Sequence, residues 1–143
     1  MRTMLLFSLI CLPLKHLQLT SGFGYRSHPL TGKFSFHSGV DLRASRDTVF
    51  AVMDGSAISV SYDRGLGICI RLAHGTVETS YGHLSAVLIH PGDSVLAGQP
   101  IAVTGATGTV TGEHLHFSVR CGKKPVDPLE FIYQNIINNK NHE

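Results

Sequence analysis

Charge is scarce in this sequence of 143 residues, of which 15% are charged, and the basic residues hardly outnumber the acidic ones, 12 against 10. A net charge of +2 is too small for a surface that follows a phosphate backbone, and no cluster of Lys and Arg accompanies it. We therefore expect no nucleic acid partner. The 43% of hydrophobic residues and the 15 Gly are typical of a compact chain rich in turns, which excludes disordered and coiled-coil proteins.

Long helical periodicity is also lacking. From Leu17 onward, short β-rich runs are separated by Gly, Asp, Pro and Ser, a spacing that predicts an antiparallel β protein. The runs are 48–52, 57–60, 67–72, 77–81, 101–104 and 114–120. Only 127–133 has a helical signature, with Asp127 as the cap and Pro128 in the first turn. We expect residues 134–143 to form a polar, frayed tail.

Nine His stand out against the low charge, because His both binds metals and transfers protons near neutral pH. His114 and His116 are two residues apart in a predicted strand, so both imidazoles lie on one face and Leu115 on the other. His37 and Asp41 are four residues apart, with a Gly between them that allows a bend. Two imidazoles and one carboxylate suit Zn²⁺ and leave a fourth position for water. The combination predicts a metal site.

His83 adds a fourth candidate histidine, in a glycine-containing turn. The motifs run in the order SGFGYR (21–26), HSGVD (37–41), YGHL (81–84) and HLHF (114–117). This order resembles the M23 metallopeptidases of the LytM and lysostaphin type, and the resemblance extends over about Leu17 to Ile132. It implies an all-β fold, an antiparallel two-sheet sandwich of the duplicated hybrid motif type with a short C-terminal helix, in one zinc peptidase domain over 17–133.

The resemblance implies that His37, Asp41 and His116 bind one Zn²⁺ per chain, while His83 and His114 are catalytic residues outside the metal's ligand set. Three protein ligands leave a position for water, whose pKa a catalytic zinc lowers to about 7. The two remaining imidazoles can take the proton of that water, stabilise the oxyanion and protonate the leaving amine. The sequence has no HExxH motif, so it offers no helical Glu as the base.

Three further polar residues have simpler interpretations. We interpret Glu113 as a surface residue, because strand alternation turns it away from the two His of the HxH motif. His28 matches none of the motif positions, and we expect it to be solvated or hydrogen-bonded. Arg26 has two open interpretations: it anchors a loop through backbone carbonyls, or it binds substrate.

The implied function is a zinc-dependent endopeptidase that hydrolyses peptide cross-links or stem peptides of bacterial peptidoglycan. The alternative is a catalytically inactive LytM-like domain that binds or regulates cell-wall hydrolases, and the presence of all five site residues favours the enzyme. Residues 92–101 also resemble a block of biotin and lipoyl carrier domains, but no Lys lies on a matching hairpin. The sequence does not identify the peptide bond that is cleaved.

Residues 1–16 form an apolar leader with the charged-then-apolar order of a signal peptide, although no small-x-small cleavage site follows. The apolar run of about eleven residues is too short for a stable membrane span. A buried first strand or a truncated reading frame is the alternative. The implied chemistry favours export, so we expect a secreted protein of the bacterial cell envelope, periplasmic or extracellular. Without a wall-targeting domain, it finds peptidoglycan by itself or through an envelope protein partner.

Cysteine is sparse, with three residues and no CxxC motif. Removal of the leader would take Cys11 away and leave Cys69 and Cys121 as the one candidate pair for a disulfide. Each of these two lies in or at the end of an apolar run, so they are equally well explained as small core or strand-end residues. The sequence leaves this choice open.

Overall fold

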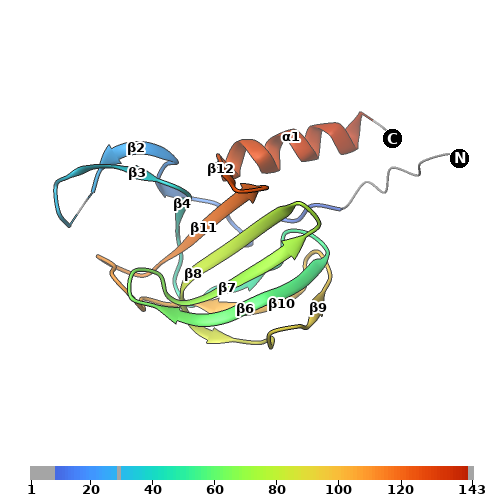
Figure 1. Ribbon diagram of the computed structural model, residues 1–143, viewed down its shortest axis with the longest axis horizontal. Helices are drawn as coiled ribbons and strands as arrows, with labels where there is room; N and C mark the ends of the chain where they lie inside the picture. Colours follow the sequence, from blue (N-terminus) through green and yellow to red (C-terminus); the bar gives the residue numbers. More distant parts are fainter. Residues whose placement is uncertain (1–8, 29, 142–143) are drawn as a thin grey trace, which may run out of the picture.

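Antiparallel β-sheet dominates the computed structural model, which describes residues 9–28 and 30–141 (Figure 1). The strands are β1 (Leu19–Ser21), β2 (Gly24–Ser27), β3 (Phe34–His37), β4 (Val40–Arg43), β5 (Thr48–Phe50), β6 (Gly55–Asp63), β7 (Gly67–His74), β8 (Val77–Val87), β9 (Ser94–Val95), β10 (Pro100–Thr104), β11 (His114–Cys121) and β12 (Lys124–Val126). Each recorded strand pairing is antiparallel. The predicted fold class is confirmed.

The described strands belong to two sheets of unequal size. The ten-stranded sheet has the order β1-β4-β11-β8-β7-β6-β9, with β12 beside β11 and β10 joining β8 to β5. The other sheet is the hairpin of β2 and β3, which lies apart from the main body at the left of Figure 1. The eleven-residue strand β8 holds the larger sheet together, because it pairs with β11, β7 and, at its end, β10.

The core lies on one face of the central strands. On β11, Leu115, Phe117 and Val119 are fully buried, and on β4 so are Val40 and Leu42. Burying an aliphatic or Phe side chain contributes about 1.5–3 kcal/mol, so these strands are firmly anchored. Alternation then places the intervening residues of β4 and β11 on the opposite face of the sheet.

The helix α1 (Pro128–Lys140) begins where the sequence predicts but ends later. Asp127 caps it by accepting hydrogen bonds from the backbone N–H groups of Leu129 and Glu130. The expected frayed tail from residue 134 is wrong as far as Lys140, because Ile136 continues the apolar face one turn beyond the buried Ile132. No helix in the described part of the chain is long and apolar enough to cross a membrane.

The described part of the apolar leader packs against the sheet. Ile10 and Leu14 are buried in the core, and the backbone N–H of Cys11 donates to the carbonyl of Val52 at 2.8 Å. This packing agrees with the alternative of a buried first segment, although the segment forms no strand. Residues 1–8, the rest of the predicted leader, lie outside the described residues. The domain limits at 16 and 133 and the removal of a leader stay predictions.

All three cysteines are free thiols in this structure. Cys69 is buried on β7, with its Sγ 3.6 Å from the hydroxyl of Ser61, whereas Cys121 is exposed at the end of β11. In this structure Cys69 and Cys121 are therefore separate thiols, one in the core and one at a strand end, and form no disulfide with each other.

Candidate metal centre

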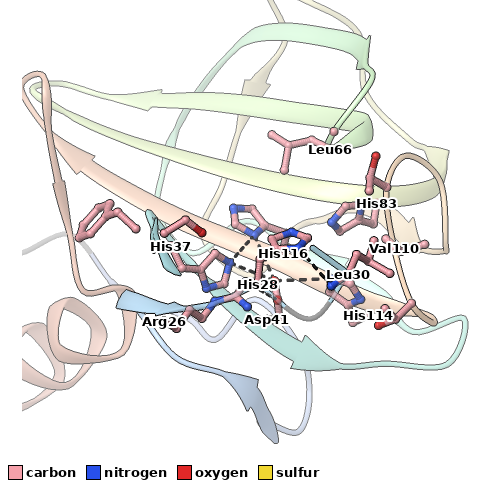
Figure 2. A pocket seen from close by; sticks show the side chains of 15 residues that line it. Arg26, His28, Leu30, His37, Asp41, Leu66, His83, Val110, His114 and His116 are labelled. Carbon is pink, nitrogen blue, oxygen red and sulfur yellow. Dashed lines mark hydrogen bonds and ion pairs between the residues drawn. The ribbon is translucent and has the colours of Figure 1, made fainter. Parts of the chain in front are cut away.

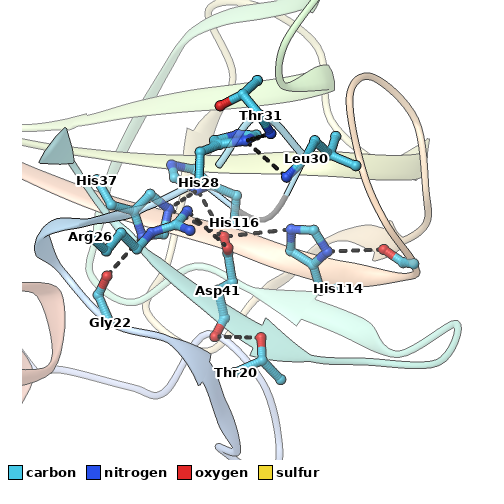
Figure 3. Close-up of polar contacts among 11 residues, drawn as sticks. Thr20, Gly22, Arg26, His28, Leu30, Thr31, His37, Asp41, His114 and His116 are labelled. Carbon is cyan, nitrogen blue, oxygen red and sulfur yellow. Dashed lines mark hydrogen bonds and ion pairs between the residues drawn. The ribbon is translucent and has the colours of Figure 1, made fainter. Parts of the chain in front are cut away.

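Sheet register brings the first two candidate ligands together. Asp41 on β4 is paired directly with His116 on β11, although the two residues are 75 positions apart in the sequence. Both side chains lie on the face opposite the buried Phe117, as the alternation of the HxH motif predicts. The Nδ1 atom of His116 is 3.1 Å from Oδ1 of Asp41 (Figure 3).

His37 enters from the end of β3 in the hairpin. Its Nδ1–H donates to the carbonyl of Gly22 at 2.8 Å, which leaves Nε2 with its lone pair toward the other two side chains. That Nε2 atom is 3.3 Å from Nδ1 of His116 and 3.4 Å from Oδ1 of Asp41. Figure 3 shows the three side chains converging from β3, β4 and β11.

The three donor atoms form a triangle that fits a zinc ion. Its sides are 3.1, 3.3 and 3.4 Å. In a tetrahedral site with bonds of about 2.0–2.1 Å, neighbouring ligand atoms are about 3.3 Å apart. His37, Asp41 and His116 are also a group whose ligand atoms lie close enough to hold one metal ion. The residues that the sequence proposes as ligands thus have both the donor set and the spacing that zinc requires.

A missing side chain lets the ligands approach one another. A Cβ atom at Gly39 would lie 2.6 Å from the carbonyl oxygen of Phe117 and 2.9 Å from the ring of His116. Real Cβ atoms do not come so close, so the turn between His37 and Asp41 requires Gly for its contact with β11. This is the bend that the HSGVD motif predicts.

The two other histidines of the motifs stand beside the triangle. Nδ1–H of His83 donates to the carbonyl of Thr107 at 2.7 Å, and Nδ1–H of His114 donates to that of Gly112 at 2.9 Å. Both Nε2 atoms are therefore free of the ring proton in the neutral form. The centroids of the two imidazole rings are 4.6 Å apart, and Nε2 of His114 is 3.5 Å from Oδ1 of Asp41. All five predicted site residues line one cavity of about 220 Å³ (Figure 2).

His83 has an unusual backbone, with φ at 60° in the left-handed region. Its N–H donates to the carbonyl of Leu66 at 2.6 Å, which ties it to the turn before β7. Asp63 closes that turn by accepting the N–H groups of Gly65 and Leu66. Through Leu66 and the carbonyl of Thr107, two separate loops fix the direction of this imidazole.

The electrostatics of the cluster are dominated by one carboxylate. Burial raises the pKa of Asp41, but contacts with His114, His116 and His37 outweigh it and hold that pKa far below its ordinary value. Asp41 is therefore ionised throughout the physiological range. Burial lowers the pKa of His83, an effect that the Thr107 carbonyl partly offsets. The Asp41 carboxylate raises the pKa of His114 against the effect of burial.

The cavity also contains polar residues to which the sequence assigned no metal or catalytic role. Arg26 reaches Asp41, with Nη2 3.8 Å from Oδ2. His28, which matches no motif position, lines the same cavity, and its Nδ1 accepts the backbone N–H groups of Leu30 and Thr31 at 3.2 and 3.4 Å. Alternation along β2 is a signal that could have found Arg26, because it lies two residues from Gly24, which pairs with His37. His28 comes directly after the strand, and no signal in the sequence places it in the cavity.

Glu113 has a structural contact that the interpretation as a surface residue does not include. Its Oε1 accepts the backbone N–H of Arg46 at 2.7 Å, and the buried Thr104 approaches the same oxygen at 3.4 Å. Arg46 has φ at 48°, so the carboxylate stabilises a left-handed turn after β4. Glu113 thereby links this turn to the start of β11, next to His114.

The antiparallel β fold and the His–Asp–His donor triangle in a cavity are together the combination expected of a zinc peptidase domain. Comparison with known families places the chain within that class: the model of peptidase family M23 matches residues 35–128, more than half of the chain. The chain belongs to peptidase family M23.

Similarity to individual proteins agrees with this. The chain is 40% identical over 116 residues to the peptidoglycan DD-endopeptidase ShyB of Vibrio cholerae, a match that covers 79% of the chain and 27% of the relative. It is 38% identical over 119 residues to the DD-carboxypeptidase/endopeptidase Mpg of Neisseria meningitidis, covering 82% and 27%. A zinc-containing peptidase from Vibrio cholerae has a similar structure, with a TM-score of 0.73 and 39% identity over 78% of the chain and 35% of that protein. The chain spans about a quarter of the two curated relatives.

Proposed function

We propose that this chain is a zinc-dependent endopeptidase that hydrolyses peptide cross-links or stem peptides of bacterial peptidoglycan. The donor triangle of His37, Asp41 and His116, with sides of 3.1–3.4 Å, is the observation that carries the proposal. The names of the two curated relatives support peptidoglycan as the substrate class. Because peptidoglycan lies in the cell envelope, we place the protein there as part of the proposal. We also propose an envelope protein as a partner.

The five residues divide into ligands and proton carriers. Nε2 of His37, Oδ1 of Asp41 and Nδ1 of His116 would hold one Zn²⁺. A zinc ion bound there supplies a Lewis acid and lowers the pKa of water in its open position. His83 and His114 act from the side: each has Nδ1–H fixed on a carbonyl and Nε2 open to the cavity.

The proton steps follow from this arrangement. One of the free Nε2 atoms accepts the proton of the attacking water, which makes that ring an imidazolium. The imidazolium then stabilises the developing oxyanion and returns the proton to the leaving amine. The carbonyls of Thr107 and Gly112 keep both rings in the required tautomer throughout. Binding all four His to the ion would close the open position, so the separation of roles is needed for catalysis.

Digestion of purified muropeptides tests the proposal. The zinc-loaded protein should cleave a peptide bond of Gram-negative or Gram-positive muropeptides, as read by mass spectrometry, and the chelator-treated protein should be inactive until zinc is restored. The products also identify the bond. A protein that binds zinc yet cleaves no muropeptide would instead be the inactive LytM-like domain, and one that takes up no zinc would contradict the metal centre itself.

A further inference from the structure

Arg26 brings a guanidinium group into the cavity of the candidate metal centre. It lies on β2 opposite Ser35 of β3 and lines the cavity together with Asp41 (Figure 2). Its Nη2 atom is 3.8 Å from Oδ2 of Asp41, which is an ion-pair distance but too long for a hydrogen bond. The other oxygen of that carboxylate, Oδ1, faces the imidazoles. The guanidinium therefore lies beside the metal centre without being hydrogen-bonded to it.

The hydrogen-bonding capacity of Arg26 is incompletely used. Its Nε atom is buried and finds no hydrogen-bond partner among residues 9–28 and 30–141, while the side chain as a whole is 23% exposed. The exposed part of the side chain lines the cavity, so a ligand there can offer an acceptor to the guanidinium. The planar fork of a guanidinium matches a planar, bidentate acceptor, and in a peptide that acceptor is a carboxylate.

The charge of the cavity favours the same ligand. Asp41 is the only acidic side chain among the described residues that line it. A divalent ion together with Arg26 would outweigh this single negative charge, because the imidazole ligands are neutral when they bind metal. The loaded cavity would thus be positive, and a positive cleft concentrates anionic substrates.

We propose that Arg26 binds a free carboxylate of the substrate, on the residue that flanks the scissile bond. The location follows from the cavity: Arg26 and the three candidate ligands line the same cavity, and Nη2 of Arg26 is 3.8 Å from Oδ2 of Asp41. A carboxylate bound by this guanidinium would therefore lie beside the metal centre, on a residue close to the attacked bond. The inference rests on the proposed function and narrows its substrate class to peptides with an acidic group at that place.

Paired substrates test the role of Arg26. One is a cross-linked muropeptide with a free carboxylate on the flanking residue, and the other is the same muropeptide amidated there. We expect the zinc-loaded protein to favour the free acid by at least ~10-fold in kcat/KM, as for a hydrogen-bonded charge pair. Arg26→Met should lose this preference by slowing cleavage of the acid alone, and Arg26→Lys should retain part of it, because Lys keeps the charge without the fork.

A matched control is Arg43→Met, which removes an exposed arginine from β4 that lines a different cavity, and it should keep the preference. Equal cleavage of both substrates by the unaltered protein overturns the inference. So does an Arg26→Met variant that binds zinc more weakly and slows both substrates alike, since Arg26 would then act through Asp41. If neither substrate is cleaved, the proposed function fails, and calorimetric binding of the two peptides to the zinc-loaded protein still decides whether Arg26 distinguishes them.

Discussion

Asp41, His114 and His116 stand on strands of the ten-stranded sheet, whereas His37 comes from the separate hairpin of β2 and β3. The sheet residues are backed by fully buried neighbours on β4 and β11. The outer face of the hairpin, by contrast, carries aromatic rings that are largely open to solvent: Tyr25 is 73% exposed and stacks on Phe34, which is 72% exposed.

This difference shows two ways of placing a candidate metal ligand. In the sheet, position follows from register, so moving a ligand means breaking several strand hydrogen bonds and uncovering core residues. In the hairpin, one hydrogen bond to the carbonyl of Gly22 holds the imidazole of His37. Further support comes from Phe23, which packs against the core and whose ring centroid lies 5.2 Å from that of Phe36. We expect the sheet to determine stability and the hairpin to determine how completely the zinc site is formed.

The largest expected effect is the loss of the shared carboxylate. Asp41→Ala removes one donor and the charge that faces three imidazoles, so the variant should lose bound zinc and activity together. Elemental analysis after reconstitution measures the metal, and muropeptide cleavage measures the activity. Asp93→Ala is the matched control, because Asp93 lies in an exposed turn and does not line the cavity, and this variant should retain about one zinc per chain. Retention of full zinc content by Asp41→Ala would exclude Asp41 from the ligand set.

The proposed proton carriers should behave differently from the proposed ligands on the same sheet. His83→Ala and His114→Ala should each lose activity by ~10²-fold or more, the scale of general acid–base catalysis, and still bind zinc. His116→Ala, two residues from His114 on β11, is the matched comparison and should lose the metal. Zinc loss from His83→Ala or His114→Ala equal to that from His116→Ala would show that the roles are assigned wrongly.

Two Phe truncations separate the sheet from the hairpin. Phe117→Ala empties a fully buried position behind His116 and should lower the free energy of unfolding by about 3–5 kcal/mol. Phe23→Ala, at the root of the hairpin, should lower it much less but weaken zinc affinity by ~10-fold or more, as loss of support for a ligand does. Urea unfolding and zinc titration give the two quantities. Equal effects of both variants on stability would mean that the hairpin is as firmly built as the sheet.

The smallest expected effect concerns a histidine of the sheet outside the cavity. Burial lowers the pKa of His74, although the carbonyl of Asp54 partly offsets this. The His74 imidazole therefore takes up a proton more readily in the unfolded chain than in the folded one. The free energy of unfolding is accordingly unaffected by His74 above about pH 6.5 and falls as the pH drops below that value.

In the zinc-free protein, the urea midpoint should thus fall between pH 7.5 and pH 5 by more in the unaltered chain than in His74→Gln. The difference between the two isolates His74 from the site histidines, which also titrate in this range. An identical fall in both proteins would show that His74 is not responsible.

The parts of the centre that the sequence predicted are those set by local periodicity. Alternation along β11 placed His114 and His116 on one face, and the glycine in the HSGVD motif predicted the bend. The direct pairing of Asp41 with His116 depends on strand register between distant segments, which a single sequence does not encode locally. The resemblance to a family supplied the division into three ligands and two other His.

Elsewhere, tertiary contacts decided what periodicity could not. The helix continues past residue 133 because Ile136 finds the core, a contact that depends on where the helix packs. Glu113 looks solvent-facing by parity, yet it binds the left-handed turn at Arg46, whose position is fixed by chain segments far away. The approach of Arg26 to Asp41 likewise follows from how the hairpin lies on the sheet.

The left-handed backbone of His83 and its proposed catalytic role make opposite demands on the residue at position 83: stability favours Gly or Asn, whereas activity requires His. A side chain with a Cβ pays about 1–2 kcal/mol in this region, from which Gly is exempt and which Asn tolerates better. A mutant library screened only for survival of heating should therefore enrich Gly or Asn at position 83, and those clones should be inactive because they lack the proposed proton carrier. Improvement of this domain as a heat-resistant reagent thus requires a screen that scores cleavage alongside survival, or a library in which codon 83 is held constant.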